Sequence, residues 1–304
     1  MAGINLDGAR VLLTGASSGI GRATALRLAS RGARLAVVAR RRELLESLAD
    51  EAATRGLARP LVLVADLSQR GAAHAVADAA REGFGVVDIL VNNAGGGVGG
   101  SQWAVGDGDA GREAFEVNYW SPLALIHELV PAMRERRQGA VVNVTSLAQV
   151  SAWPGFGAYA ATKAALALST HTLDAELHGS GVQVIEVVPG PVDTAVQGET
   201  RLLPGIERML DRQPLGDPDV LAARIVRALE RGRRRVVYPR SGRFPLVLPG
   251  IARGYTRRLA ARTWSTVDAQ RREELLGTVV RSGSMGDAVA REARDAWERA
   301  RARA

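Results

Sequence analysis

A glycine-rich stretch near the start of the chain limits the possible fold more than any other feature. It reads Thr14-Gly15-Ala16-Ser17-Ser18-Gly19-Ile20-Gly21, and it lies between an apolar run at residues 9–14 and a helical pattern at residues 22–31. A strand, a glycine loop and a helix in this order point backbone N–H groups and a helix N-terminus at a phosphate. The spacing is Gly-x-x-x-Gly-x-Gly, which differs from the Gly-x-Gly-x-x-Gly dinucleotide fingerprint. We expect a phosphate-binding loop; the alternative is an ordinary turn that starts a helix.

Short apolar runs alternate with helical patterns along the chain. The runs cover residues 9–14, 35–39, 61–65, 88–91, 139–144 and 182–188. This alternation indicates the α/β class with a parallel, doubly wound sheet of the Rossmann type. We expect one domain over residues 1–240 and a basic helical extension over residues 241–304. Because ligands of such sheets bind at the carboxyl ends of the strands, we expect one site that contains Gly15, Asp66, Asn92 and Gly95.

Between these runs, two stretches carry structural predictions of their own. Residues 113–136 form a long helical pattern that contains Pro122, which we expect to bend the helix. Asn118 lies within this pattern, either as a satisfied buried amide or as part of a proton path. The glycine-rich residues 96–100 are typical of a flexible loop.

Three arginines, Arg40, Arg41 and Arg42, follow the second apolar run. At this point NAD-binding folds carry an acid for the ribose 2′-hydroxyl, whereas an arginine accommodates a 2′-phosphate. The first acid is Glu43, so the sequence favours NADP over NAD, unless the arginines only begin the next helix. After the third run, Asp66 either caps the following helix or accepts a hydrogen bond from an adenine amino group.

Tyr159 and Lys163 are separated by one helical turn, so both side chains leave the same helix face. A nearby cation favours the phenolate and lowers the pKa of a tyrosine. A Tyr-x-x-x-Lys pair alone is weak evidence, since such pairs usually lie on solvated faces. Lys163 is however the single lysine among the 40 Lys and Arg residues of the chain. We therefore predict that Tyr159 is a proton donor tuned by Lys163.

Composition excludes several other kinds of site. The chain has no cysteine, so it has neither disulfides nor thiolate metal ligands, which suits a cytoplasmic protein. No apolar run approaches the about 20 residues of a membrane span, and the first ten residues do not resemble a signal peptide. The four histidines are scattered without a metal-ligand pattern, so we predict no metal site.

Positive charge is concentrated near the C-terminus. Residues 231–304 hold 18 arginines against 7 acids, whereas the rest of the chain has 22 basic and 25 acidic residues. A basic tail on a nearly neutral body suits an acidic partner, such as an anionic membrane surface or a nucleic acid. The alternative is a solvated, arginine-rich helical face. No recognised nucleic-acid-binding module is present, so we expect no nucleic-acid partner.

Over residues 5–240 the chain resembles the short-chain dehydrogenase/reductase family. The resemblance rests on an ordered set of motifs: the glycine loop at residues 14–21, Asn92-Asn93-Ala94-Gly95, Asn118, Ser146, the Tyr159/Lys163 pair, and Pro189-Gly190. Each motif is weak alone, but all occur in the family's order. The resemblance implies an oxidoreductase that interconverts a ketone and a secondary alcohol, and the arginines after the second apolar run favour NADP as its cofactor.

The resemblance also implies residue roles. Tyr159 would be the general acid/base, Lys163 would lower its pKa and hold the nicotinamide ribose, Ser146 would orient the substrate oxygen, and Asn118 would hold a relay water. The remaining residues would contact the cofactor: Gly15, Ser17, Ser18, Gly19, Ile20, Gly21, Arg40, Arg41, Asp66, Leu67, Asn92, Ala94, Gly95, Pro189, Gly190 and Thr194.

Substrate specificity is expected from residues 149–156 and 194–217. The first segment carries Val150, Trp153 and Phe156, which favours an apolar or bulky substrate unless these side chains form a subunit interface. Residues 244–251 are apolar but short and interrupted by proline, and a basic helix follows at residues 253–262. This part would cap the cleft, contact another subunit or rest on a membrane surface, and capping or packing is the favoured alternative.

Other functions remain compatible with the fold. The chain could be an epimerase, a biosynthetic tailoring reductase, or a non-catalytic dinucleotide sensor, although the intact Tyr/Lys pair disfavours the sensor. The family resemblance implies a homo-oligomer, a dimer or tetramer, formed through the helices that carry Asn118 and Tyr159.

Overall fold

The computed structural model describes residues 3–193, 215–265 and 277–281. Its centre is a seven-stranded parallel sheet with the order β3-β2-β1-β4-β6-β7-β8. The strands are β1 (Arg10–Thr14), β2 (Arg34–Ala39), β3 (Leu61–Val64), β4 (Ile89–Asn92), β6 (Gly139–Val144), β7 (Val182–Pro189) and β8 (Arg235–Tyr238). The predicted doubly wound α/β sheet is confirmed.

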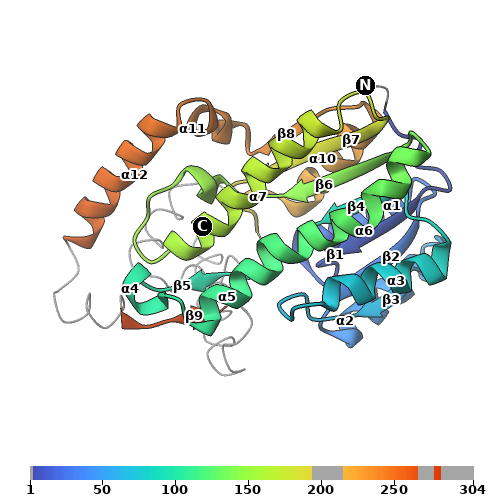
Figure 1. Cartoon of the computed structure of the whole chain (residues 1–304), viewed down its shortest axis with the longest axis horizontal. Coiled ribbons are helices and arrows are strands. Elements are labelled where there is room, and N and C mark those ends of the chain that lie inside the picture. The colour runs from blue at the N-terminus through green and yellow to red at the C-terminus, as the bar shows by residue number, and fades with distance from the viewer. Residues whose placement is uncertain (1–2, 194–214, 266–276, 282–304) are drawn as a thin grey trace.

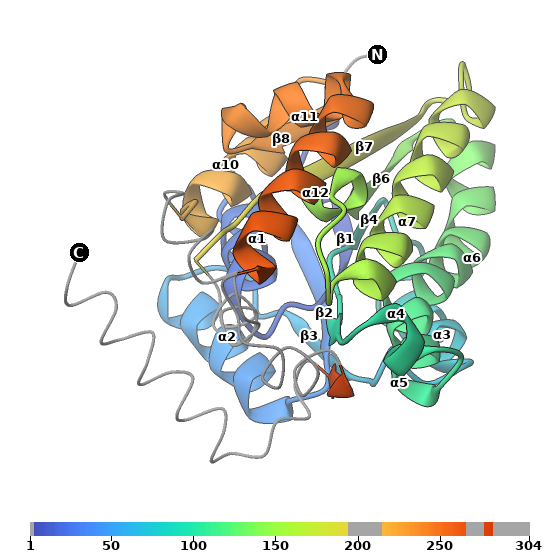
Figure 2. The ribbon, with the colours of Figure 1, turned by 90° about the vertical axis from the view of Figure 1, so that its left-hand side faces the viewer.

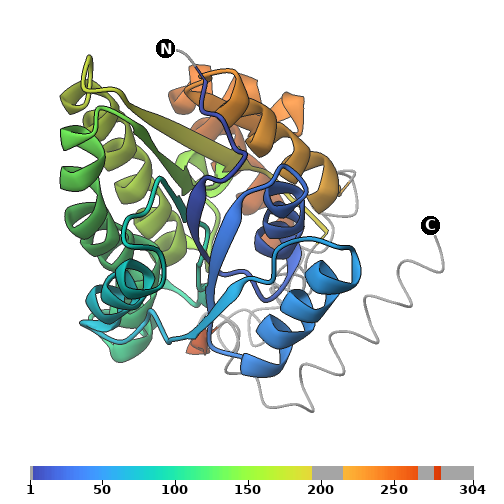
Figure 3. The same cartoon turned by 90° about the vertical axis from the view of Figure 1, so that its right-hand side faces the viewer.

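Helices cover both faces of the sheet, as Figures 2 and 3 show. One layer contains α1 (Gly19–Ala29), α2 (Arg42–Thr54) and α10 (Pro218–Glu230), and the other contains α3 (Ala72–Phe84), α6 (Ser121–Glu135) and α7 (Gly157–Glu176). Every residue of β4, β6 and β7 is buried. Strands covered on both faces are continuous apolar runs, which is why the sequence pattern predicted them.

The strand order reverses between β1 and β4. From β1 the chain builds β2 and β3 on one side, and it then returns to build β4, β6, β7 and β8 on the other side. The crevice at the carboxyl ends of β1 and β4 is therefore the topological switch point, where ligands of open α/β sheets bind. The glycine loop leaves β1 and the Asn-Asn-Ala-Gly turn leaves β4 at this crevice.

Two helix predictions need correction. Helix α1 begins at Gly19 rather than Arg22, so the last glycines of the loop already form its first turn. The helical pattern of residues 113–136 is divided into α5 (Asp109–Phe115), the π-helical turn η1 (Glu116–Trp120) and α6. Pro122 lies in the first turn of α6, where a missing N–H is tolerated, so the irregularity precedes it.

The glycine-rich loop of residues 96–100 contains a strand that sequence reasoning did not predict. Strand β5 (Val98–Gly99) pairs antiparallel with β9 (Val280–Arg281). A segment near the C-terminus therefore lies beside the loop that follows β4, close to α4 (Gln102–Val105). The prediction of a plain loop is wrong here.

Beyond β8, residues 240–265 form what we call the C-terminal arm. The arm contains η3 (Arg240–Gly242), α11 (Arg243–Val247) and α12 (Pro249–Trp264). In Figure 1 α12 lies at the end of the molecule opposite to β3. Both helices pack on the turn η2 (Leu147–Val150), which follows β6.

Candidate functional site

Hydrogen bonds join the loop after β1 to the turn after β4. Thr14 Oγ1 accepts from the backbone N–H groups of Asn93 and Ala94, each at 3.0 Å. In return, Asn93 Nδ2 donates to the carbonyl oxygens of Thr14 at 3.0 Å and Gly15 at 3.1 Å. These bonds fix the loop after β1 against the turn after β4. The sequence analysis did not assign a role to Asn93, although this residue lies inside the Asn-Asn-Ala-Gly motif.

The glycine loop is too tight for side chains at two of its glycines. Gly15 has a φ of 70°, and a Cβ there would lie 2.7 Å from the Cα of Ala94. At Gly21 a Cβ would lie 2.1 Å from the carbonyl oxygen of Gly15. The N-terminus of α1 has no side-chain cap and no acid in its first turn, so its N–H groups are suited to an anion. This cradle fits the pyrophosphate of a dinucleotide.

Arg41 is the N-cap residue of α2, and its guanidinium lies 3.5 Å from Ser17 Oγ of the glycine loop. Arg40 is exposed beside it, and Arg42 pairs loosely with Glu46 inside the helix. An arginine facing the loop offers charge for a 2′-phosphate on an adenosine ribose.

Asp66 shapes the turn that follows β3. Its Oδ1 accepts from the backbone N–H of Ser68 at 3.0 Å and from the Ser68 hydroxyl at 2.8 Å. Leu67 is buried, and its carbonyl accepts from the Ser121 hydroxyl at 2.8 Å. Asp66 therefore orders the loop with one oxygen, and any adenine contact would need the other.

The Asn92 side chain lies in the sheet interior rather than in the crevice. Its Nδ2 donates to Asn143 Oδ1 at 2.9 Å, and Asn143 Nδ2 donates to Thr170 Oγ1 of α7 at 2.9 Å. If Asn92 contacts a ribose, the contact would come from its main-chain atoms. Asn143 and Thr170 were missed by sequence reasoning, although an Asn inside the apolar run of β6 was a signal of a buried amide.

Asn118 clamps the main chain of Gly96 from the π-helical turn. Its Oδ1 accepts from the Gly96 N–H at 3.2 Å, and its Nδ2 donates to the Gly96 carbonyl at 2.7 Å. A Cβ on Gly95 would lie 3.0 Å from Asn118 Oδ1 and 3.3 Å from Lys163 Nζ, so these groups converge on Gly95. Of the two alternatives left by the sequence, the satisfied buried amide is the one seen, and π-turns often lie at functional sites.

Lys163 is buried on α7, with a side chain only 4% exposed. Its ammonium donates to the Val144 carbonyl at 3.1 Å and has no second acceptor among the described residues. Desolvation lowers the pKa of Lys163 to about 8. Two N–H groups of the ammonium therefore remain for ligands near Gly95.

Tyr159 lies one turn before Lys163 and packs edge-on against Phe156, with ring centroids 5.9 Å apart. Burial raises the pKa of Tyr159, and hydrogen bonding to Ser146 partly opposes this. The direction is opposite to the one expected from Lys163, because desolvation is the larger effect. Ser146 is held in place as the N-cap of η2, where its Oγ accepts from the Ala148 N–H at 3.1 Å.

Pro189 ends β7, and Gly190 follows with its N–H donating to the Tyr238 carbonyl at 2.7 Å. A Cβ on Gly190 would lie 3.0 Å from Leu147 Cδ1, so this turn contacts η2. Thr194 and most of the expected specificity segment 194–217 lie outside the described residues. In the other specificity segment Trp153 is buried.

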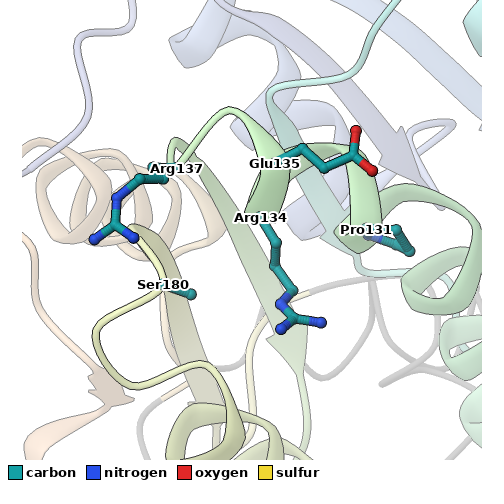
Figure 4. Close-up of a pocket in the computed structure, with 5 residues that line it drawn as sticks. All are labelled: Pro131, Arg134, Glu135, Arg137 and Ser180. Carbon is teal, nitrogen blue, oxygen red and sulfur yellow. The ribbon is translucent and has the colours of Figure 1, made fainter.

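Two hollows lie away from these residues. One, of about 400 Å³, is lined by Pro131, Arg134, Glu135, Arg137 and Ser180 (Figure 4). It lies where the chain enters β6 and β7, at the amino ends of the strands. A second, of about 280 Å³, lies over the α7 side of β7 next to His171 and Glu186. Neither contains a predicted site residue, and the amino end of a parallel sheet is not where its ligands bind.

Within the described residues, no three His, Asp or Glu side chains gather as metal ligands. His74 and His171 each pair with one carboxylate, at Glu128 and Glu186. Over the same residues, no helix is both long and apolar enough to cross a bilayer.

Comparison with protein-family models matches residues 9–202 to the short chain dehydrogenase family. A short chain dehydrogenase of Pseudocercospora fijiensis is 38% identical over 192 residues, which is 62% of this chain and 61% of that protein. A fatty acyl-CoA reductase of Mycobacterium tuberculosis is 34% identical over 213 residues, 68% of this chain and 70% of that protein. The match thus spans about three fifths of the first relative's length.

Solved structures give the same result. A short chain dehydrogenase/reductase from Burkholderia phymatum in complex with NAD has a TM-score of 0.71 at 28% identity, covering 82% of this chain and 97% of that one. A short-chain dehydrogenase from Sphingobium yanoikuyae in complex with NADPH has a TM-score of 0.67 at 28% identity, covering 86% and 99%. The two relatives differ in which nicotinamide dinucleotide they hold.

Proposed function

Because this chain belongs to the short-chain dehydrogenase/reductase family, we propose that it is an NADP-dependent oxidoreductase that interconverts a ketone and a secondary alcohol. The observation that carries the proposal is the position of Tyr159. Its phenol lies one helical turn from the buried Lys163, and Ser146 lowers the pKa that burial of the phenol raises. Lys163 in turn approaches Gly95, in the turn that is hydrogen-bonded to the glycine loop.

The bound nicotinamide would supply or accept a hydride. When a carbonyl carbon gains a hydride, its oxygen becomes an alkoxide that needs a proton. Tyr159 gives that proton from its hydroxyl, and the raised pKa keeps the hydroxyl protonated at neutral pH. Ser146 Oγ holds the carbonyl oxygen beside the phenol. In the oxidative direction Tyr159 accepts the proton from the alcohol.

Lys163 serves this chemistry with its charge and its free donors. Since its pKa is about 8, the ammonium is mainly charged at pH 7 despite its burial. The two N–H groups that Val144 does not occupy would hold the nicotinamide ribose. Asn118 holds the main chain of Gly96 and so keeps the neighbouring Gly95 close to the ammonium.

The choice of NADP rests on Arg41. Its guanidinium lies 3.5 Å from Ser17 Oγ of the glycine loop. The residues between the end of β2 and Glu43 are all arginine, so no carboxylate stands there. A 2′-phosphate at this point would gain a cationic partner, whereas a ribose hydroxyl lacks the carboxylate that NAD-binding folds supply.

The substrate is an apolar ketone or alcohol, and the enzyme acts as a homo-oligomer. Val150 and Trp153 are buried in the segment that follows Ser146, so this side of the site is built from apolar residues. Trp120 and Leu168, on the π-turn and on α7, are 53% and 69% exposed, which suits a helix–helix contact between copies.

The test is NADPH oxidation with a panel of aliphatic, aromatic and steroidal ketones. The wild-type chain turns over at least one of them, and Tyr159→Phe lowers kcat by about 10²- to 10⁴-fold, since it removes only the proton donor. NADPH binding, followed by fluorescence, stays within twofold in the variant. Normal turnover by Tyr159→Phe rules out the mechanism, and loss of cofactor binding shows that the phenol serves the fold instead.

A further inference from the structure

The C-terminal arm exposes large apolar side chains that the sequence pattern suggested would pack or cap the cleft. They are Phe244 (60% exposed), Val247 (74%), Leu248 (41%), Ile251 (58%) and Tyr255 (66%). Phe244 and Val247 are three residues apart on α11, Ile251 and Tyr255 are four residues apart on α12, and Leu248 is the residue between the two helices; we call these five residues the stripe. Several large apolar side chains exposed on adjoining helices mark an interaction site in a protein that is otherwise well packed.

The stripe is not a core face, because α12 already buries its opposite side. Ala252 and Ala260 face inward and are 8% and 2% exposed. Thr256 Oγ1 accepts from the Ala152 N–H at 3.2 Å, which attaches the helix to the loop after η2. Small residues thus form the packed side and large apolar residues the outer side, the reverse of an ordinary surface helix.

Charge on the arm has one sign. Residues 240–265 contain no acid and six arginines, all exposed: Arg240, Arg243, Arg253, Arg257, Arg258 and Arg262. None of the six forms an ion pair with a described residue, whereas Arg22, Arg31 and Arg59 at the helices α1 and α2 each pair with a glutamate. Guanidinium groups bind phosphate by two parallel hydrogen bonds.

We propose that the stripe and arginines of the C-terminal arm dock the protein on an anionic phospholipid surface. Apolar side chains enter the acyl boundary and the arginines bind lipid phosphates, which is how interfacial helices bind without spanning a bilayer. A second copy of the chain fits worse, because a two-fold contact would place six arginines of one arm against six of the other.

The docking surface adjoins the candidate active site. A Cβ on Gly242 would lie 2.6 Å from Leu147 Cδ1, and Leu147 follows Ser146 directly. A docked arm would hold the substrate segment around Ser146 and Trp153 near the lipid. This extension rests on the proposed function, and it assigns the substrate to apolar ketones or alcohols dissolved in the membrane.

The docking test uses the full chain and needs neither cofactor nor substrate. Phosphatidylcholine vesicles, with or without phosphatidylglycerol, are sedimented with the protein. The wild type binds the anionic vesicles and not the neutral ones. A triple variant of the stripe, Phe244→Ser, Val247→Ser and Ile251→Ser, and a charge variant, Arg253→Gln, Arg257→Gln and Arg258→Gln, each bind at least tenfold more weakly.

Two control variants separate docking from general effects. Trp103→Ser removes an equally exposed apolar side chain from α4, and Arg70→Gln, Arg134→Gln and Arg231→Gln remove three exposed arginines elsewhere. Both bind like the wild type. The proposal is overturned if the wild type does not bind anionic vesicles, or if the controls lose binding as strongly as the arm variants.

Light scattering without lipid tests whether a second copy of the chain, instead of a membrane, binds the stripe. If the stripe variant changes the particle mass while vesicle binding is unaffected, the stripe is a protein interface and the proposal fails. Activity is a separate readout. The arm variants reduce a water-soluble ketone at the rate of the wild type. They reduce a long-chain ketone in anionic vesicles at least fivefold more slowly than the wild type does. An inactive wild type would refute the proposed function and leave vesicle binding as an independent result.

Discussion

Near the carboxyl ends of β1 and β4, Asn118 and Lys163 are buried and hydrogen-bonded to the main chain, whereas on α11 and α12 large apolar side chains are exposed. Asn118 and Lys163 are 1% and 4% exposed, and Phe244 and Val247 are 60% and 74% exposed. Buried polar groups require fixed partners, so the first region depends on the position of each atom. The second depends on surface character, which many sequences could supply.

The two regions also differ in what their glycines do. A Cβ on Gly21 of α1 would lie 2.1 Å from a backbone oxygen, whereas a Cβ on Gly254 of α12 meets nothing within 4 Å. In the site, glycine is required for close approach of two main-chain segments. In the arm it only weakens a helix.

The largest effect is expected from the same substitution at these two glycines. Gly21→Ala forces the glycine loop apart, which destabilises the protein by about 3 kcal/mol and abolishes NADPH binding at micromolar cofactor. Gly254→Ala stabilises by about 0.5 to 1 kcal/mol, because alanine favours the helix. Urea unfolding and NADPH titration measure both. Equal effects at the two positions would remove the distinction between the regions.

A second pair compares isoleucines. Ile225 of α10 is fully buried against the sheet, and Ile251 of α12 is 58% exposed. Ile225→Ala leaves a cavity and lowers the free energy of unfolding by about 3 kcal/mol. Ile251→Ala changes it by less than about 0.5 kcal/mol. A large loss at Ile251, measured by urea unfolding without lipid, would mean that the stripe is covered within the protein itself.

The sheet and the set of site motifs were predictable from the sequence because both depend on short-range order. Parallel strands buried on two faces are apolar runs, and residues that directly follow these runs share one edge. The orientation of Asn92 was not predictable, because β4 continues through that residue and side chains alternate along a strand. One residue more or less of strand decides whether Asn92 or Asn93 faces the crevice.

The π-turn at Asn118 and the exposed stripe needed tertiary information. Helix periodicity does not reveal one extra residue in a turn. The burial of Asn118 is explained only by its two hydrogen bonds to the main chain of Gly96. In the arm, apolar residues suggested burial, but that rule holds in one direction only, since apolar atoms form much of any protein surface. The small residues Ala252 and Ala260 took the packed positions instead.

The pH dependence of stability tests the buried charge in the first region. The pKa of Lys163 is about 8 in the folded chain against an ordinary value of 10.5, so the unfolded state holds the proton more tightly. Burial of the ammonium therefore destabilises the fold below pH 8, and this cost declines as the pH rises toward 10.5. Lys163→Met removes the cost at all pH values.

We expect Lys163→Met to be more stable than the wild type at pH 7, and this advantage to shrink by about 2 kcal/mol at pH 9.5. Urea unfolding of both proteins at the two pH values gives the double difference, in which groups common to both cancel. An advantage that is constant with pH would show that the ammonium is solvated rather than buried.

The smallest effect is expected where the site itself reaches the surface, at the arginines after β2. Arg41 approaches Ser17 of the glycine loop at 3.5 Å, whereas its neighbour Arg42 is 3.8 Å from Glu46 within α2. Both are exposed, so water and salt weaken any single charge contact. Arg41→Ala should lower the ratio of kcat/KM for NADPH over NADH about tenfold, which is about 1.4 kcal/mol, and Arg42→Ala should leave it unchanged. Steady-state kinetics with both cofactors measure this ratio. A drop in Arg42→Ala alone would move the 2′-phosphate contact to the helix. A ratio unchanged in both variants would mean that neither arginine contacts the cofactor.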